Sequence, residues 1–235
     1  KMYVILPFEK KFYEDKHHFP VEFVGHPLID AIYNQPIVDP VLFRKENQLN
    51  DKPIIAILPG SRKQEITKML AVMLSVVNDF PDHQFVIAGA PSQEFSFYQK
   101  FITQENIKFI SNKTYDLLRN ATAALVTSGT ATLETALFKV PEVVCYKGSW
   151  ASYQIAKRII TLKYISLVNL IMDEEVVTEL IQEECNTKRI REELQKTLKT
   201  NDRNTLLEKY ALLEEKLGGI GASEKTATLI VNDLK

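Results

Sequence analysis

The residues with the clearest chemical potential form the stretch 127–134, Thr-Ser-Gly-Thr-Ala-Thr-Leu-Glu. The apolar run 123–126 before it predicts a strand buried on both faces, and a helix is expected to begin near Thr130. Free backbone N–H groups at such a helix start can bind an anion, typically phosphate, and Gly129 lets a ligand approach the backbone. Glu134 follows about one helical turn later, where its carboxylate can accept hydrogen bonds from the 2′- and 3′-hydroxyls of a sugar.

The same stretch also fits an ordinary helix cap. Ser or Thr before a helix, with Glu soon after, is the pattern of a capping box. These residues alone fit the cap and the ligand site equally well, so the rest of the chain has to decide.

A second loop with phosphate-binding chemistry is Gly60-Ser61-Arg62, after a predicted strand at 54–58. Arginine is a permanent bidentate donor, well suited to a diphosphate. A cation is disfavoured in the first turn of a helix, so the position of Arg62 hints at a bound anion. The alternative is a surface arginine at a helix start.

The elements that would position these loops form a regular series from residue 53 onward. Apolar runs predict strands at 54–58, 85–89, 107–110, 123–126 and 142–146, and helices are expected between them and at 150–162. This alternation predicts an α/β fold with a doubly wound parallel sheet, in which ligands bind beyond the carboxyl ends of the strands. Helices are expected beyond Asp173, the last at 223–234. Before residue 53, short strands are expected at 2–6 and 21–24, and His26 fits either a structural role or a cleft.

Composition excludes several classes of protein. The chain has 235 residues, a formal net charge of −1 and two cysteines, Cys145 and Cys185. Nucleic acid is therefore an unexpected partner, and a buried reduced thiol is the better interpretation of Cys145. No apolar run is long enough to span a membrane and no signal peptide is visible, which predicts a cytoplasmic protein. The chain opens on Lys1 and then on an apolar strand, which predicts a fragment of a longer protein.

Familiar signatures are also missing. The sequence has no G-x-G-x-x-G, no G-K-[ST] and no G-x-S-x-G, which argues against a dinucleotide fingerprint, a P-loop and a hydrolase elbow. His17 and His18 have no third ligand at metal spacing, and no zinc pattern occurs. A diphosphate held without a P-loop, together with a carboxylate for a ribose, indicates a nucleotide-sugar site. We therefore expect neither a metal nor a cofactor.

Five motifs in order resemble the lipid-A-disaccharide synthase family. They are L-P-F-E-K at 6–10, G-H-P at 25–27, L-P-G-S-R at 58–62 with Glu65, S-G-T-A-T-L-E at 128–134, and S-L-V-N-L at 166–170 with Q-E-E-C at 182–185. The resemblance implies the two-domain glycosyltransferase-B fold and a Gram-negative source. It also implies transfer of 2,3-diacylglucosamine from UDP-2,3-diacylglucosamine to 2,3-diacylglucosamine 1-phosphate, giving the β-1,6-linked lipid A disaccharide and UDP.

Carried over onto this chain, the resemblance assigns roles to residues. Ser61 and Arg62 would meet the diphosphate, and Glu134 would hold the ribose. Asn169 would line the donor site, although Val168 stands where the family has proline. The cradle of backbone N–H groups and hydroxyls would come from Ser128, Gly129, Thr130, Ala131 and Thr132. Donors of this kind stabilise a leaving diphosphate without a metal. No catalytic residue is assigned, because the general base is expected in a preceding domain.

The resemblance also implies an organisation and partners. Residues 1–30 would be the remnant of an acceptor domain, 31–52 a connector, 53–217 the donor-binding domain, and 218–235 a helix that crosses back. Peripheral contact with the inner face of the inner membrane is expected because both substrates are acylated. Aromatic and basic residues around one short helix fit this: Trp150, Tyr153, Lys157, Arg158, Lys163 and Tyr164. They fit a solvated helix face equally. A swapped homodimer through 223–234 is a further expectation.

Two alternatives stay open. The first is another UDP-sugar enzyme of the same fold, such as an undecaprenyl-linked N-acetylglucosaminyl transferase or a non-hydrolysing 2-epimerase. The second is a nucleotide-binding module without chemistry, acting as a sensor or scaffold.

Overall fold

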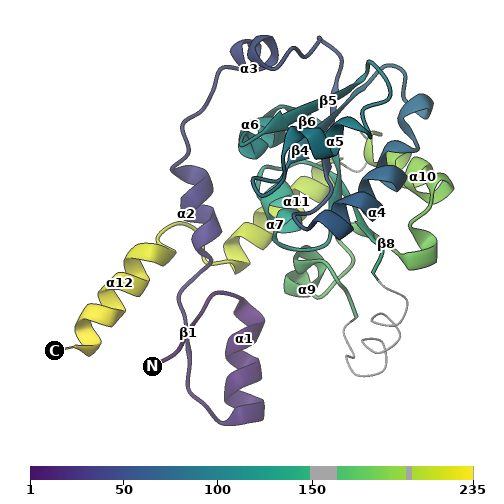
Figure 1. Cartoon of the computed structure of the whole chain (residues 1–235). Coiled ribbons are helices and arrows are strands. Elements are labelled where there is room, and N and C mark those ends of the chain that lie inside the picture. Colours follow the sequence, from purple (N-terminus) through teal and green to yellow (C-terminus); the bar gives the residue numbers. More distant parts are fainter. Residues whose placement is uncertain (149–162, 200–202, 235) are drawn as a thin grey trace.

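A parallel sheet with helices on both faces forms the centre of the molecule (Figure 1). The computed structural model describes residues 1–148, 163–199 and 203–234. Six strands are hydrogen-bonded in the order β5-β4-β3-β6-β7-β8, and every neighbouring pair is parallel. They are β3 (Ile54–Leu58), β4 (Gln84–Gly89), β5 (Ile107–Ser111), β6 (Ala121–Thr127), β7 (Glu142–Tyr146) and β8 (Thr178–Ile181). The predicted doubly wound α/β sheet is confirmed.

The helices divide between the two faces of this sheet. One face is covered by α4 (Lys63–Leu74), α5 (Phe95–Gln99) and α10 (Thr187–Thr197). The other is covered by α3 (Pro40–Glu46), α6 (Thr114–Asn120), α7 (Thr130–Leu137), α9 (Leu167–Met172) and α11 (Arg203–Lys216). Short helical turns η2 (Val77–Asp79) and η3 (Gln182–Glu184) complete this part of the chain.

Strand β3 shows why the central strands are continuously apolar. Ile55 and Ile57 pack with α4 on one face, whereas Ile54, Ala56 and Leu58 pack on the other. All five residues are buried, because a strand in the middle of a doubly wound sheet has no solvent face. This strand ends at the loop that carries Ser61.

Two elements differ from the sequence-based expectation. The region beyond Asp173 was expected to be helical, but Thr178–Ile181 is strand β8, which pairs with the edge of β7. A strand this short at a sheet edge leaves too little periodicity in the sequence to be recognised. Residues 27–33, to which no helix was assigned from the sequence, form helix α2 (Pro27–Tyr33). The helical prediction for residues 178–181 was wrong, and α2 was missed, because long-range packing stabilises these short elements.

His26 serves as the cap of α2. Its Nδ1 accepts a hydrogen bond from the Leu28 backbone N–H at 3.2 Å, and the imidazole is buried. Burial lowers the pKa of His26, while the charge of Glu9 acts in the opposite direction. Neutral imidazole with Nδ1 as acceptor suits this cap, so the structure gives His26 a structural role.

The two ends of the chain meet outside the sheet (Figure 1). Here β1 (Tyr3–Val4) pairs in parallel with β2 (Glu22–Phe23), next to α1 (Pro7–Lys11) and the π-helical turn η1 (Phe12–Lys16). The Asp30 carboxylate caps α12 (Ala222–Asp233), accepting from the N–H groups of Gly221 and Ser223 at 2.6 and 2.8 Å. The Tyr3 hydroxyl donates to Asp233 Oδ2 at 2.6 Å. Helix α12 therefore runs from α2 back to the first residues.

Some expectations concern other parts of the chain. Cys145 and Cys185 are both buried free thiols, as expected for Cys145. Trp150, Tyr153, Lys157 and Arg158 lie outside the described residues. Among the described helices, none is long and apolar enough to cross a membrane.

Candidate functional site

A pocket of about 300 Å³ lies beyond the carboxyl ends of β3, β4 and β6. It is lined by the loops that follow these strands, by Thr114 of α6, and by the carboxylates of Glu65 and Glu134. Six residues singled out from the sequence line it together: Ser61, Ser128, Gly129, Thr130, Ala131 and Glu134. The two loops that the sequence suggested for phosphate chemistry therefore border one cavity.

The start of α7 supplies the main anion-binding feature of this pocket. The first N–H groups of a helix have no partner within the helix, and those of α7 begin at Thr130. Gly129, immediately before it, has φ +144° and ψ −162°, a conformation that only glycine adopts without strain. No atom lies within 4 Å of the position that a Gly129 side chain would take. The space in front of the helix start is therefore open to a ligand.

The hydroxyls of Ser128 and Thr132 were expected to contact the diphosphate, but they donate hydrogen bonds to backbone carbonyls. Ser128 Oγ donates to the Ile165 carbonyl oxygen at 2.8 Å, and Thr132 Oγ1 donates to the Gly129 carbonyl oxygen at 2.8 Å. Each hydroxyl has one proton, so both are used to hold the loop. Thr132 is also fully buried and does not line the pocket. In this geometry neither of these two hydroxyls is left to donate to an anion, whereas the first backbone N–H groups of α7 are.

Glu134 is held in the pocket by a neighbour on another helix. The Tyr115 hydroxyl of α6 donates to Glu134 Oε1 at 3.0 Å. Burial raises the pKa of the Glu134 carboxyl, and the hydrogen bond from Tyr115 acts in the opposite direction. The carboxylate keeps acceptor capacity on both oxygens, which suits a pair of adjacent hydroxyls.

The loop after β3 is closed by Glu65. The Ser61 backbone N–H donates to Glu65 Oε2 at 3.2 Å. Gly60 has φ +99°, and a side chain there would collide with the same carboxylate. Glu65 therefore closes the loop after β3 and adds a second carboxyl group to the pocket lining.

Besides Thr132, two predicted site residues lie outside the pocket lining. Arg62 is the N-cap residue of α4, and its side chain is exposed to solvent. Asn169 is fully buried, and its amide oxygen accepts from the N–H groups of Val176 and Val177 at 2.8 and 3.0 Å. The Asn169 Nδ2 group donates to the Val177 carbonyl and to Glu179. The amide of Asn169 is thus fully used within the fold.

Sequence reasoning did not assign a role to several residues that line or support the pocket. Glu65 entered only as part of a motif, and Thr127 only as the first residue of the loop 127–130, without a role of its own. The Thr127 Oγ1 atom is buried without a hydrogen-bond partner among the described residues, although Thr127 lines the pocket. Its place at the carboxyl end of the strand was the available signal. Tyr115 gave none, because its contact with Glu134 joins two helices.

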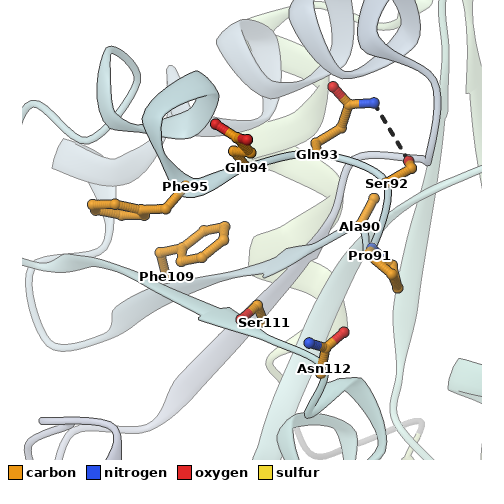
Figure 2. Close-up of a pocket in the computed structure, with 9 residues that line it drawn as sticks. All are labelled: Ala90, Pro91, Ser92, Gln93, Glu94, Phe95, Phe109, Ser111 and Asn112. Atoms are coloured by element: carbon orange, nitrogen blue, oxygen red, sulfur yellow. Dashed lines mark hydrogen bonds between the residues drawn. The ribbon is translucent and has the colours of Figure 1, made fainter.

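A second pocket, of about 380 Å³, adjoins the first and shares Ala90 and Pro91 with it. Figure 2 shows the rings of Phe95 and Phe109 at one end and Asn112 at the other. The two ring centroids lie 5.1 Å apart. The pocket therefore combines an aromatic wall with polar groups, and it extends the first pocket along the carboxyl ends of β4 and β5.

With this geometry in view, the comparisons with known proteins are informative. A family profile described as lipid-A-disaccharide synthetase matches residues 1–229. The chain belongs to this family. It is 37% identical to the lipid-A-disaccharide synthase of Idiomarina loihiensis, over 96% of this chain and 61% of the relative. It is 36% identical to that of Coxiella burnetii strain CbuG_Q212, over 98% of this chain and 62% of the relative.

The synthase family proteins are longer than this chain. The match to the lipid-A-disaccharide synthase of Syntrophus aciditrophicus is 37% identical, with 100% of this chain and 63% of the relative covered. The chain thus spans a little over three-fifths of the curated relatives it matches.

Solved structures show the same fold. An S. aureus MnaA–UDP co-structure matches with a TM-score of 0.64 and 16% identity, over 95% of this chain and 57% of that one. WaaG, a glycosyltransferase involved in lipopolysaccharide biosynthesis, matches with a TM-score of 0.52 and 15% identity, over 89% and 57%. The family membership and these neighbours agree with the glycosyltransferase-B architecture that the motifs implied.

Proposed function

We propose that the pocket beyond β3 and β6 binds the UDP part of a UDP-sugar, in the donor-binding half of a lipid-A-disaccharide synthase. The whole enzyme would transfer 2,3-diacylglucosamine from UDP-2,3-diacylglucosamine to 2,3-diacylglucosamine 1-phosphate. The observation that carries this proposal is the placement of the α7 N-terminus and Glu134 in one pocket. Anion donors and a carboxylate one helical turn apart match a diphosphate joined to a ribose.

In the proposed transfer reaction, the start of α7 would stabilise the negative charge of the leaving group. A hydroxyl of the acceptor attacks the anomeric carbon of the donor, the bond from that carbon to the UDP oxygen breaks, and the hydroxyl proton passes to a base. Negative charge develops on the leaving diphosphate. The backbone N–H groups of Thr130 and Ala131, assisted by the Arg62 side chain, would stabilise that charge. The base is proposed to lie in the part of the enzyme that precedes this chain.

The adjoining pocket is a suitable place for the nucleobase. Its aromatic wall of Phe95 and Phe109 offers contact to a flat ring, and Ser111 and Asn112 offer polar groups. A base there would leave the ribose near Glu134 and the diphosphate at the start of α7. The co-structure of MnaA with UDP supports a nucleotide on this fold, although the likeness by itself concerns the fold alone.

Contact with the membrane belongs to the same proposal because both substrates carry acyl chains. Of the aromatic and basic residues expected to contribute, Lys163 and Tyr164 are described, and the Lys163 Nζ lies 4.9 Å from the Tyr164 ring centroid. Binding to vesicles that contain anionic lipid, compared between the wild type and a variant with W150A and K157A, tests this. Equal binding by both would remove that segment from the membrane contact. The swapped homodimer stays a prediction, and light scattering tests it.

Donor profiling of the full-length enzyme tests the proposed function. With the diacylated donor and acceptor, the wild type should form the disaccharide and release UDP without added metal. E134A should lower kcat/KM, whereas E183A, an exposed carboxylate on η3, should leave it unchanged. Conversion of UDP-N-acetylglucosamine to its 2-epimer would favour an epimerase. UDP binding without turnover of any sugar donor would favour a non-catalytic module.

A further inference from the structure

The hydrogen bond between Tyr115 and Glu134 joins α6 to α7, the helix that follows the loop 127–129. Tyr115 lies on α6 and Glu134 on α7, and their side chains meet at 3.0 Å. A flexible glutamate would otherwise have several rotamers available within an open pocket. The tyrosine hydroxyl selects the one in which Oε1 faces α6.

The tyrosine ring is itself held in place. Its centroid lies 5.1 Å from that of Phe138, the residue that ends α7. The Arg119 guanidinium lies 5.3 Å from the Phe138 ring centroid. Arg119 in turn donates to the Pro36 carbonyl at 3.0 Å and to Asp116 at 3.4 Å. The hydroxyl of Tyr115 is therefore presented to Glu134 from a packed position.

Among the described residues, the charges around this pair do not provide an alternative partner. Glu65 of α4 is the other carboxylate that lines the pocket, and on α6 the charges of Asp116 and Arg119 are paired with each other. Burial, the charge of Glu134 and their hydrogen bond raise the pKa of Tyr115 to about 12. Tyr115 thus remains a hydrogen-bond donor to Glu134 throughout the physiological range.

Resting on the proposed UDP site, we propose that Tyr115 is a positioning residue that turns Glu134 toward the ribose and so selects ribonucleotides. Tyr115 occupies one acceptor position on Oε1. The remaining lone pairs of Oε1 and Oε2 are left for the 2′- and 3′-hydroxyls. A 2′-deoxyribose can satisfy only one of these positions, so the fixed carboxylate discriminates against it.

Affinities for UDP and 2′-deoxy-UDP, measured by calorimetry on the wild type and Y115F, test this role. Phenylalanine keeps the packing against Phe138 and removes only the hydroxyl. The wild type should prefer UDP by about tenfold, the scale of one charge-assisted hydrogen bond. Y115F should reduce that preference to about threefold or less, chiefly by weakening UDP binding. A purely structural role would weaken both nucleotides equally.

A matched control is available in the same chain. The Tyr33 hydroxyl donates to Glu214 Oε1 at 2.8 Å, away from the pocket, so Y33F removes the same kind of bond. Y33F should leave both affinities unchanged. If Y115F keeps the wild-type preference for UDP, the proposed role of Tyr115 is wrong, and the proposed UDP site is unaffected. Absence of UDP binding by the wild type would instead overturn the proposed function on which this role rests.

A measurement without nucleotide tests the contact between Tyr115 and Glu134 independently of the proposed UDP site. The ionisation of Glu134 can be followed by the ¹³C shift of its carboxyl carbon as pH is varied. Because the donated hydrogen bond favours the carboxylate, Y115F should raise the pKa of Glu134, and Y33F should not. An identical titration of Glu134 in the wild type and Y115F would contradict the contact between the two side chains in solution.

Discussion

Ser128 donates its only hydroxyl proton to the carbonyl oxygen of Ile165, 2.8 Å away. This bond joins the loop between β6 and α7 to the segment that leads into α9. The same segment is held by Glu179 of β8, which accepts from the N–H groups of Ile165 and Ser166 at 2.9 Å each. The loop at the proposed diphosphate site is therefore positioned from the edge of the sheet.

Replacement of Asn169 by alanine should destabilise the fold. The buried N–H groups of Val176 and Val177 would lose their acceptor, and each unsatisfied group costs about 1–3 kcal/mol. Urea denaturation should show a free energy of unfolding lower by about 2–4 kcal/mol. Unchanged stability with lost UDP binding would instead return Asn169 to the donor site.

Replacement of Gly129 by alanine should weaken UDP binding through the backbone. A side chain meets no atom there, but φ +144° is strained for any L-residue, at a cost of about 1–3 kcal/mol. The loop would relax and turn the first N–H groups of α7 away from the diphosphate. G219A is the matched control, because Gly219 also has positive φ and open space around it but lies outside the pocket. Equal losses of UDP affinity in both variants would contradict a specific role for Gly129.

Replacement of Arg62 by alanine tests the cation that was inferred from the sequence. Its side chain is exposed, so removal should leave the thermal unfolding temperature unchanged. UDP affinity should fall by about 1–3 kcal/mol at low salt and by less at high salt, because an exposed charge is screened. The neighbouring variant K63A serves as control, since the Lys63 Nζ lies over the Phe97 ring at 5.4 Å from its centroid. Calorimetry at two salt concentrations measures the difference, and an R62A affinity equal to that of K63A would exclude the contact.

Replacement of Glu142 by glutamine should change how stability depends on pH. The Glu142 carboxyl has no hydrogen-bond partner among the described residues, and complete burial raises its pKa well above 4.5. The folded state therefore binds this proton more tightly than the unfolded state does. The associated stability is fully present below pH 4.5 and is lost as pH rises through the folded pKa. E142Q should remove this decline and be the more stable protein at pH 8.

Glu214 gives the opposite sign and serves as the control. Although burial acts to raise it, hydrogen bonds from Lys139 and Tyr33 lower the pKa of Glu214. Its stabilisation is present above pH 4.5 and is lost as pH falls through the lower folded value, so E214Q should be less stable than the wild type at pH 7. Parallel curves of unfolding free energy against pH for the wild type and E142Q would contradict the assignment of a buried, protonated Glu142.

The parts of the fold that could be predicted from sequence are those in which local pattern and packing agree. Strand β3 is continuously apolar because both of its faces are buried, and the stretch after β6 carries small residues at a helix start. Strand β8 could not be predicted, because Thr178–Ile181 is short and owes its conformation to pairing with β7. The same holds for α2, whose apolar residues pack against α7 and α11.

The candidate site shows the same limit. The residues that line it could be predicted from sequence where they lie within three residues of the end of a strand, as Ser61 and Thr130 do. The hydrogen-bond partner of a hydroxyl could not be predicted. Ser128 was therefore expected to contact the diphosphate, whereas its hydroxyl donates to the Ile165 carbonyl oxygen. Asn169 was assigned by resemblance, whereas its buried amide supports the turn before β8. The role of Tyr115 could not be predicted, because its contact with Glu134 depends on how α6 lies beside α7.

Calorimetric titration of this chain with UDP, in the presence of a chelator and with ADP as the control, tests whether the pocket binds the nucleotide of a UDP-sugar. We expect UDP to bind without metal and ADP to bind at least about tenfold more weakly. The same titration on the full-length protein shows whether the other domain contributes to affinity. Equal affinity for the two nucleotides, or no binding of UDP by either protein, would contradict the assignment of this pocket as a UDP-sugar site.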